Sequence, residues 1–237
     1  MKLGGIDGCS AGWIIVRYID GIYDLEIYDD FKSLILNNKH LDRLLIDIPI
    51  GLSSKMFKRT IDSKLRGELK NRSSTVFNAP CRSAVYELDD KLARQLNIKI
   101  ENKSLSIQSL AIRGKIKEVD EYLTKNKSGI TIIESHPELC FKYLYGSIVQ
   151  SKKSTPEGVN ERLAIIENYD AKLVELYQIK QNEIKRKHAK RDDIIDAICL
   201  CLANKLGSEK NLSYLVDENA VDEKEIMIKI GHYQEGN

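Results

Sequence analysis

The fold is indicated most clearly by the segment Leu44-Leu45-Ile46-Asp47-Ile48-Pro49. An apolar run of this kind, ended by a proline, is typical of a strand buried on both faces of a parallel sheet. Pro49 forces an extended exit from the strand, and Asp47 would be costly to bury within it. A carboxylate at the carboxyl end of a parallel strand points into the crevice where open α/β sheets bind ligands. The stretch therefore predicts an α/β sheet with an acidic side chain at its ligand-binding edge.

The same pattern recurs at three other places along the chain. Asp7 follows the apolar run 3–6, and Glu134 follows the run 130–133. A third acidic group, Asp192, Asp193 and Asp196, opens an apolar helix. So many like charges are tolerated together only when cations neutralise them, and carboxylate oxygens suit Mg²⁺ or Mn²⁺. The predicted metal ligands are Asp7, Asp47, Glu134, Asp192, Asp193 and Asp196, and all of them except Asp192 are also predicted to be catalytic.

Each acid also has a purely structural explanation. Aspartate before glycine is a common turn residue, which applies to Asp7. An acid in the first turn of a helix complements the helix dipole, so Asp192 or Asp193 could simply cap. Asp196 lies a full turn further along, on the same helix face as both, and capping does not require it. The alignment of several acids at strand ends favours a shared metal site.

The remaining pattern predicts one mixed sheet and a helical insertion. Residues 13–18 and 22–28 alternate as strands around Asp20-Gly21, a hairpin signal, and with residues 2–7 they make a three-stranded antiparallel meander. Residues 43–48 and 130–134 are the expected parallel strands. Helical periodicity over 54–71 and 104–125 predicts a helical insertion at about residues 54–125. We expect a main domain over 1–207 and a weakly patterned C-terminal extension over 208–237, with a final strand over residues 225–230.

Composition restricts the class of protein. The chain has 237 residues, of which 42% are hydrophobic and 30% charged, as expected for one large soluble α/β domain. No apolar stretch reaches the length of a membrane span, and the N-terminus enters a strand instead of a signal peptide. Five cysteines, an odd number without a C-x-x-C pair, argue against disulfides and structural zinc and favour the cytoplasm. Because the net charge is only +2, contact with nucleic acid would depend on a local cluster of basic residues. The sequence makes no prediction of the oligomeric state.

Local cations supply candidates for holding phosphates. A basic run over residues 185–191 leads directly into Asp192, and such a run is either a solvated face or a site for a polyanion. Arginines flank a loop rich in hydroxyl and amide groups over residues 72–82, which suits a phosphate clamp. His136 stands two residues beyond a strand-end acid, where it could act as a ligand or proton shuttle. The predicted substrate contacts are Arg72, Asn78, Arg82, His136, Lys152, Lys187, Lys190 and Arg191.

Five sequence blocks resemble a known family. They are Gly5-Ile6-Asp7-Gly8-Cys9 with Gly12-Trp13, Asp47-Ile48-Pro49-Ile50-Gly51-Leu52, the segment 76–82, Glu134-Ser135-His136-Pro137-Glu138, and Asp192-Asp193-Ile194-Ile195-Asp196-Ala197. In this order they resemble an uncharacterised family of predicted ribonuclease H-like nucleases, over about residues 3–205. The resemblance implies a ribonuclease H-like fold: a mixed five-stranded sheet of three antiparallel and two parallel strands, with helices on both faces.

The resemblance also implies two Mg²⁺ ions and assigns them ligands. Asp7 matches the strand-one aspartate of the superfamily, and Asp47 matches an acid at the end of the fourth strand. Asp193 and Asp196 match the acids of the C-terminal helix of Holliday-junction resolvases. Glu134 has no counterpart in the resolvase pattern, so its expected role depends on its position at a strand end.

Three functions remain open at this point. A nuclease that hydrolyses phosphodiesters in DNA or RNA with two metal ions is favoured. A phosphotransferase or ATPase of the sugar-kinase and actin type is the alternative, because Asp7-Gly8-Cys9-Ser10 resembles the phosphate-binding turn of those proteins. Such proteins need two duplicated domains and a second Asp-x-Gly turn, and 237 residues without that turn argue against them. A non-catalytic nucleic-acid-binding module is the third possibility, which an intact acid set disfavours.

Overall fold

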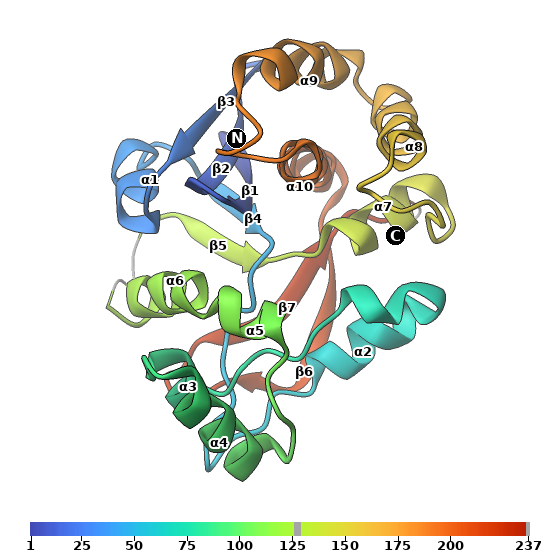
Figure 1. The fold of residues 1–237 in the computed structure, drawn as a ribbon. Coiled ribbons are helices and arrows are strands. Elements are labelled where there is room, and N and C mark those ends of the chain that lie inside the picture. The colour runs from blue at the N-terminus through green and yellow to red at the C-terminus, as the bar shows by residue number, and fades with distance from the viewer. Residues whose placement is uncertain (126–128, 236–237) are drawn as a thin grey trace. The chain divides into compact units, whose positions relative to one another are not determined.

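The computed structural model describes residues 1–125 and 129–235. Within them the chain forms a mixed seven-stranded sheet accompanied by ten α-helices (Figure 1). The strands lie in the order β3-β2-β1-β4-β5-β7-β6. Their bounds are β1 Leu3–Cys9, β2 Gly12–Ile19, β3 Ile22–Tyr28, β4 Arg43–Ile46, β5 Thr131–Glu134, β6 Ser213–Val221 and β7 Met227–His232. The α/β class is confirmed, but the sheet has seven strands instead of the five expected.

The antiparallel part of the sheet follows directly from local sequence. Strands β1, β2 and β3 pair in succession, with Asp7 opposite Ile14 and Ile15 opposite Glu26. Asp20 and Gly21 both have positive φ, 51° and 87°, which is what a two-residue hairpin of this twist requires. The predicted hairpin at Asp20-Gly21 is therefore confirmed.

The parallel part brings the ends of three strands to one level. Strand β4 pairs in parallel with β1 on one side and with β5 on the other, so that Ile6, Ile46 and Glu134 form one row. The Asp47 N–H donates to the Ile6 carbonyl at 3.0 Å, and the Ser135 N–H donates to the Ile46 carbonyl at 2.8 Å. The next row therefore holds Asp7, Asp47 and Ser135.

The helices connect these strands and cover the sheet. Their bounds are α1 Phe31–Asn37, α2 Ile61–Glu68, α3 Arg82–Tyr86, α4 Asp90–Glu101, α5 Ile107–Ala111, α6 Arg113–Lys125, α7 Pro137–Tyr145, α8 Pro156–Glu167, α9 Ala171–Glu183 and α10 Arg191–Lys210, with a 3₁₀ helix η1 over Lys70–Thr75. Phe31 of α1 packs on Trp13 of β2 with ring centroids 5.3 Å apart. Trp13 pairs with Gly8, one residue from Asp7, so α1 covers the face opposite the Asp7 side chain.

Helix α10 covers the face of the sheet that carries Asp7. A Cβ atom on Gly5 would lie 2.1 Å from the Cys201 nitrogen and 2.4 Å from the Ala197 carbonyl oxygen, so only glycine lets this helix approach β1 so closely. Residues 194–203 of α10 are all buried. Leu45 and Ile133, which share the Asp7 face of the sheet, belong to the same core cluster. The close packing fixes the first turns of α10 relative to the end of β1.

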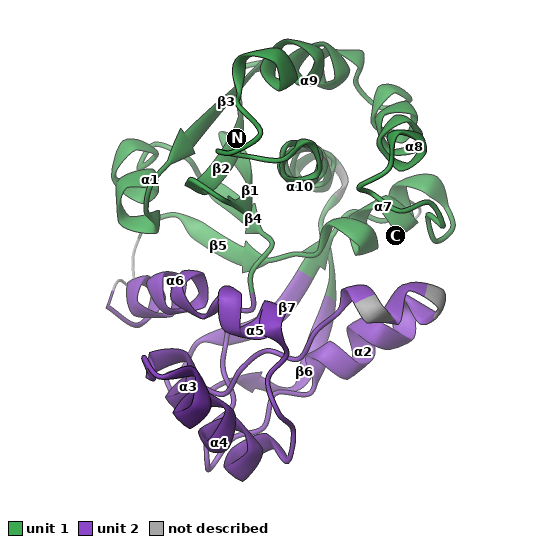
Figure 2. Ribbon diagram, viewed as in Figure 1, with its two compact units in different colours: residues 1–48, 129–214, 231–237 green, residues 49–128, 215–230 purple. Residues whose placement is uncertain are grey.

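The chain divides into two compact units (Figure 2). Unit 1 consists of Met1–Ile48, Gly129–Tyr214 and Gly231–Asn237, and it contains every predicted metal ligand. Unit 2 consists of Pro49–Ser128 and Leu215–Ile230, so helices α2 to α6 belong with a segment that the sequence assigns to a C-terminal extension. That segment supplies most of β6 and β7, of which β7 matches the expected strand over residues 225–230 and β6 was not expected. Among the described helices, none is long and apolar enough to cross a membrane.

Candidate functional site

Asp7 and Asp47 lie side by side at the ends of neighbouring strands. Asp7 is buried, and its Oδ1 accepts the Gly8 N–H at 2.7 Å. Burial raises the pKa of Asp7 well above its usual value, and the negative charges of Asp47 and Asp196 raise it further. Burial, together with Asp196, raises the pKa of the half-buried Asp47 to about 7. Both carboxylates therefore lie within the electrostatic field of other acids.

The first turns of α10 supply two more acids. Asp196 is fully buried, and its Oδ1 has no hydrogen-bond partner among the described residues. Asp193 accepts the Lys190 N–H at 2.8 Å, so it caps the helix as the structural alternative proposed. Burial raises the pKa of Asp193 to about 6, with the charges of Asp192 and Asp196 adding to the effect. Asp193 thus combines capping with membership of the acidic cluster.

Lys153 is the cation of this cluster, and the sequence does not single it out. Its Nζ pairs with Oδ2 of Asp196 at 2.5 Å, and the Lys153 side chain is 41% exposed. The charge of Asp196 raises the pKa of Lys153, and Asp7 and Asp47 also contribute to the rise. The adjacent residue Lys152, which the sequence predicts as a phosphate contact, is exposed. A loop without periodicity gives no signal that would distinguish these two lysines.

The loop that carries Lys153 is held in place by a buried ion pair. The Arg162 guanidinium, fully buried in α8, donates to Oε1 of Glu138 at 2.7 Å and to the Ser151 carbonyl at 3.3 Å. Gly158 allows the Lys152 carbonyl to approach α8, because a Cβ there would lie 2.0 Å from that oxygen. Breaking a buried pair of this kind by removing one partner costs about 3–5 kcal/mol. The position of Lys153 is therefore set by the fold of the loop.

Glu134 is the acid whose position differs from that of the others. It pairs with Ile46, one row before Asp7 and Asp47, and alternation directs its side chain to the opposite face of the sheet. Its charge still raises the pKa of Asp47. Within residues 1–125 and 129–235, no group of three or more Asp, Glu, His or Cys side chains is arranged to hold a metal ion. Within the acidic cluster, Asp196 forms an ion pair with Lys153.

A cleft of about 680 Å³ opens beside the acidic cluster in unit 1. Its wall comes from the Lys153 loop, from α8 and α9, and from the start of α10. Lys190 and Arg191, both predicted substrate contacts, line it together with Arg186 and Asp192. Lys187 is exposed and does not line the cleft. His136 precedes α7 as its N-cap residue, and its carbonyl accepts the Leu139 N–H at 3.0 Å.

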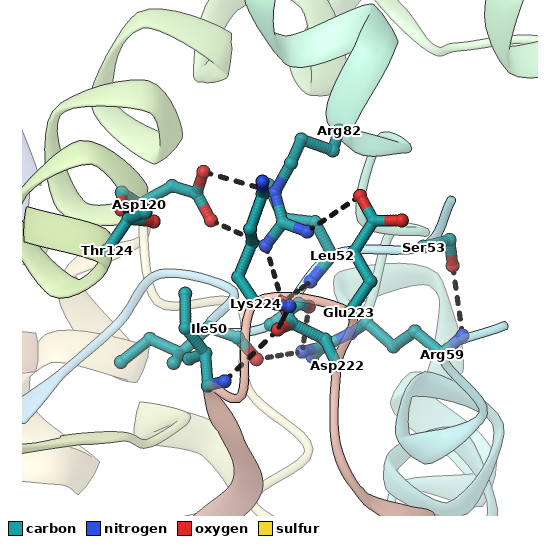
Figure 3. A network of polar contacts seen from close by, with 12 residues as sticks. Ile50, Leu52, Ser53, Arg59, Arg82, Asp120, Thr124, Asp222, Glu223 and Lys224 are labelled. Carbon is teal, nitrogen blue, oxygen red and sulfur yellow. Dashed lines mark hydrogen bonds and ion pairs between the residues drawn. The ribbon is translucent and has the colours of Figure 1, made fainter. Parts of the chain in front are cut away.

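The other predicted phosphate contacts lie in unit 2. Arg72 is half-buried within η1. The Asn78 side-chain oxygen accepts from the Arg66 guanidinium at 2.7 Å, so it already has a partner within the unit. Arg82 is buried in the polar network of Figure 3. The sequence pattern of this loop therefore did not indicate the burial or the hydrogen-bond partners of these three residues.

The Arg82 guanidinium forms ion pairs with three carboxylates. Its Nη2 lies 2.9 Å from Oδ1 of Asp120 and 2.5 Å from Oδ2 of Asp222, and its Nη1 lies 3.3 Å from Oε1 of Glu223 (Figure 3). The other oxygen of Asp222 accepts the Lys224 N–H at 2.8 Å. A guanidinium with three carboxylate partners is a structural tie between α3, α6 and the turn after β6. We therefore omit Arg82 from the phosphate contacts proposed below.

Replacing Arg82 by alanine should destabilise the protein by about 3–5 kcal/mol, because it leaves the buried Asp120 and Asp222 without their cation. Urea unfolding measures this loss. The control is Lys55→Ala, which removes an exposed cation from the lining of the neighbouring cavity and should change stability by less than about 0.5 kcal/mol. If Arg82→Ala kept full stability and instead lost affinity for nucleic acid, the phosphate-clamp role would be restored.

Comparison with known proteins gives one family. Residues 5–219 match the family described as "Protein of unknown function (DUF429)". No curated protein and no solved structure gives a significant match. The match includes Asp7, Asp47 and the acids of α10, and it extends over most of the 237 residues. The chain therefore belongs to the family described as "Protein of unknown function (DUF429)".

Proposed function

We propose that this protein has a ribonuclease H-like fold and is a metal-dependent nuclease. The observation that carries the proposal is the meeting of Asp7 and Asp47, at the ends of adjacent parallel strands, with Asp196 of α10. The strand order β3-β2-β1-β4-β5, antiparallel and then parallel, supports the fold that the family resemblance implies. Nucleic acid is the proposed partner, and the cytoplasm the proposed location.

The acids suit Mg²⁺ or Mn²⁺ on two grounds. Burial, and after it the repulsion of neighbouring acids, raises the pKa of Asp7 and of Asp47, so a divalent cation would relieve an existing electrostatic cost. The buried Oδ1 of Asp196 has no partner among the described residues, and an oxygen in that condition has a free position for a hard cation. Asp7, Asp47, Asp193 and Asp196 are the proposed ligands, and Asp192 and Glu134 are left as nearby acids. Because no three of the described acids are already arranged around one point, binding of a cation would require these side chains to turn toward it.

Different side chains of the site have different roles in the proposed hydrolysis of a phosphodiester. When bound, divalent cations supply Lewis-acid stabilisation of the charge that develops on the phosphate. Lys153, which lies between Asp196 and the cleft, donates an N–H to a phosphate oxygen and adds positive charge at the same point. Lys190 and Arg191 orient the phosphate from the start of α10. The carboxylates of the strand ends hold the cations and thereby align the reacting groups.

Metal-dependent cleavage tests this proposal. We expect end-labelled DNA or RNA to be hydrolysed in the presence of Mg²⁺ or Mn²⁺ and to remain intact in EDTA. Four substrates are needed, single-stranded and duplex DNA and RNA, because the acids alone do not select among them. Absence of cleavage with either metal on all four substrates would contradict the proposed function.

The pH dependence of Mn²⁺ binding provides a second measurement of the same site. Asp47, with a pKa of about 7, and Asp193, with a pKa of about 6, must lose their protons before they can bind a cation. The affinity should therefore rise by at least about tenfold per pH unit between pH 6 and 7 and more steeply below pH 6. It should continue to rise above pH 7 for as long as Asp7, whose pKa burial and the neighbouring acids also raise, still has a proton to lose. Calorimetric titration from pH 5.5 to 8 measures this slope. A constant affinity across that range would exclude both residues as ligands.

A further inference from the structure

The cleft beside the acidic cluster is lined by chemically different kinds of side chain. Four of them are cations, Lys153, Arg186, Lys190 and Arg191, and Asp192 is the one carboxylate in the described lining. Arg186 and Lys190 lie in the loop before α10, and Arg191 is the first residue of that helix. All three residues are exposed. Among the described residues, none of these three takes part in an ion pair, in contrast to Lys153. Their charges therefore remain available to an anion.

Three apolar or aromatic side chains also line the cleft. They are Val159 and Leu163 of α8, both half-buried, and Tyr177 of α9, with 2% of its surface exposed. Helices α8, α9 and α10 pack against one another here, so this wall is part of the main core and not a mobile flap. Such a surface suits a planar or apolar group more than a second phosphate.

Amide side chains complete the polar part of the lining. Asn160 of α8 and Gln178 of α9 are exposed, and Gln181 is half-buried. Amides both donate and accept hydrogen bonds, which matches the edge of a nucleobase. The volume of about 680 Å³ is within the range of pockets that bind one small ligand, and it is too small for a duplex.

We propose that this cleft is a nucleotide-binding pocket that holds one unstacked nucleotide unit. Its phosphate contacts Lys153, Lys190 and Arg191, next to the acids, and its base lies against Val159, Leu163 and Tyr177. This proposal rests on the proposed function, because the phosphate is placed next to the acids on the assumption that they catalyse its hydrolysis. It selects the substrate class: a single-stranded end or an unpaired nucleotide, because a base inside a duplex cannot enter a cleft of this size without unstacking.

Nucleotide binding in EDTA tests the pocket without any hydrolysis. Calorimetry with adenosine 5′-monophosphate should give an affinity at least about tenfold higher than with inorganic phosphate, because only the nucleotide also covers the apolar wall. Equal affinities for the two probes, or no binding of the nucleotide, would overturn the proposal.

A matched pair of double variants identifies the cations involved. Arg186→Ala with Lys190→Ala removes two cations that line the cleft, and should weaken nucleotide binding by about tenfold or more. Lys185→Ala with Lys187→Ala removes two exposed cations from the same loop that do not line it, and should change the affinity by less than about twofold. An equal loss in both pairs would indicate only a general electrostatic attraction and would overturn the pocket.

Failure of the pocket and failure of the nuclease activity give different results. If the nucleotide binds with the expected variant pattern but no substrate is cleaved with Mg²⁺ or Mn²⁺, the pocket stands and the proposed function is wrong. If cleavage occurs and duplex DNA or RNA with blunt ends is cleaved as fast as single strands, the nuclease stands and the pocket is wrong. We expect single strands to be cleaved at least about tenfold faster, because unstacking a base costs a few kcal/mol.

Discussion

Replacement of Asp7 by asparagine should abolish metal-dependent hydrolysis and leave a more stable protein. Asparagine keeps an oxygen that can accept the Gly8 N–H, which Asp7 Oδ1 accepts at 2.7 Å, but it removes the charge that faces Asp47 and Asp196. Loss of one carboxylate ligand removes several kcal/mol of transition-state stabilisation, or a rate decrease of about 10³-fold or more. Single-turnover cleavage with Mn²⁺ measures the loss.

The stability gain of this variant should depend on pH in a defined direction. The folded state raises the pKa of Asp7, so the native protein keeps the proton after the unfolded chain has lost it. The contribution of Asp7 to stability is therefore complete below the unfolded pKa of about 4 and is lost as the pH rises through the raised pKa. Asparagine does not ionise, so Asp7→Asn should melt at the same temperature as the natural protein near pH 4 and several degrees higher at pH 8. Each kcal/mol of gained stability should raise the melting temperature by about 2–4 °C.

The control for this prediction is Asp29→Asn, which changes an exposed aspartate in the same unit. It should alter neither the cleavage rate nor the melting temperature, since surface substitutions usually shift stability by no more than about 0.5 kcal/mol. Full cleavage activity in Asp7→Asn would remove Asp7 from the metal ligands. A lower melting temperature at pH 8 in EDTA would show that the charge of Asp7 is compensated in the native state.

Replacement of Lys153 by methionine should make the stability of the protein depend on metal. Methionine keeps much of the apolar stem of Lys153 but leaves Asp196, whose side chain is 1% exposed, without its cation. Because the Lys153 side chain is 41% exposed and water reaches it, we expect a loss of about 1–3 kcal/mol in EDTA, less than for a fully buried pair. Mn²⁺ should then restore the loss, because the freed carboxylate gains a ligand position.

Thermal unfolding with and without Mn²⁺ measures both effects. The melting temperature of Lys153→Met in EDTA should fall, and its increase upon addition of Mn²⁺ should exceed that of the natural protein. Lys152→Met is the matched control, since Lys152 is the exposed neighbour and has no ion pair among the described residues. Identical behaviour of the two variants would mean that the pair of Lys153 with Asp196 contributes nothing measurable.

Much of the sheet was predictable from local sequence because its signals are local. The Asp20-Gly21 turn needs two residues with positive φ, and the run before Asp47 needs only strand periodicity and a proline. The seven-stranded sheet was not predictable in full. Strand β7 matches the strand expected over residues 225–230, and it lies between β5 and β6. Strand β6 was not expected, because it arises from a polar segment whose alternation is weak, and it lies at the edge of the described sheet beside β7.

The candidate site divides in the same way. The positions of Asp7 and Asp47 after apolar runs predicted that these residues end neighbouring strands, and β1 and β4 do pair in parallel. The face on which each acid lies depends on register, since a shift of one residue moves a side chain to the other face. Register in a parallel sheet is set by contacts between distant strands, and this is why Glu134 was grouped with the other acids from sequence.

The α/β class, the antiparallel hairpin and the acids at the strand ends can be inferred from sequence, because each depends on residues that are neighbours along the chain. The pairing of cations with acids depends on tertiary packing: Lys153 pairs with Asp196, and Arg82 with Asp120 and Asp222. Charged residues in loops have no periodicity that reports their direction. Their partners are chosen by the packing of α8, α10 and the helices of unit 2, where burial makes an unpaired charge too costly to keep.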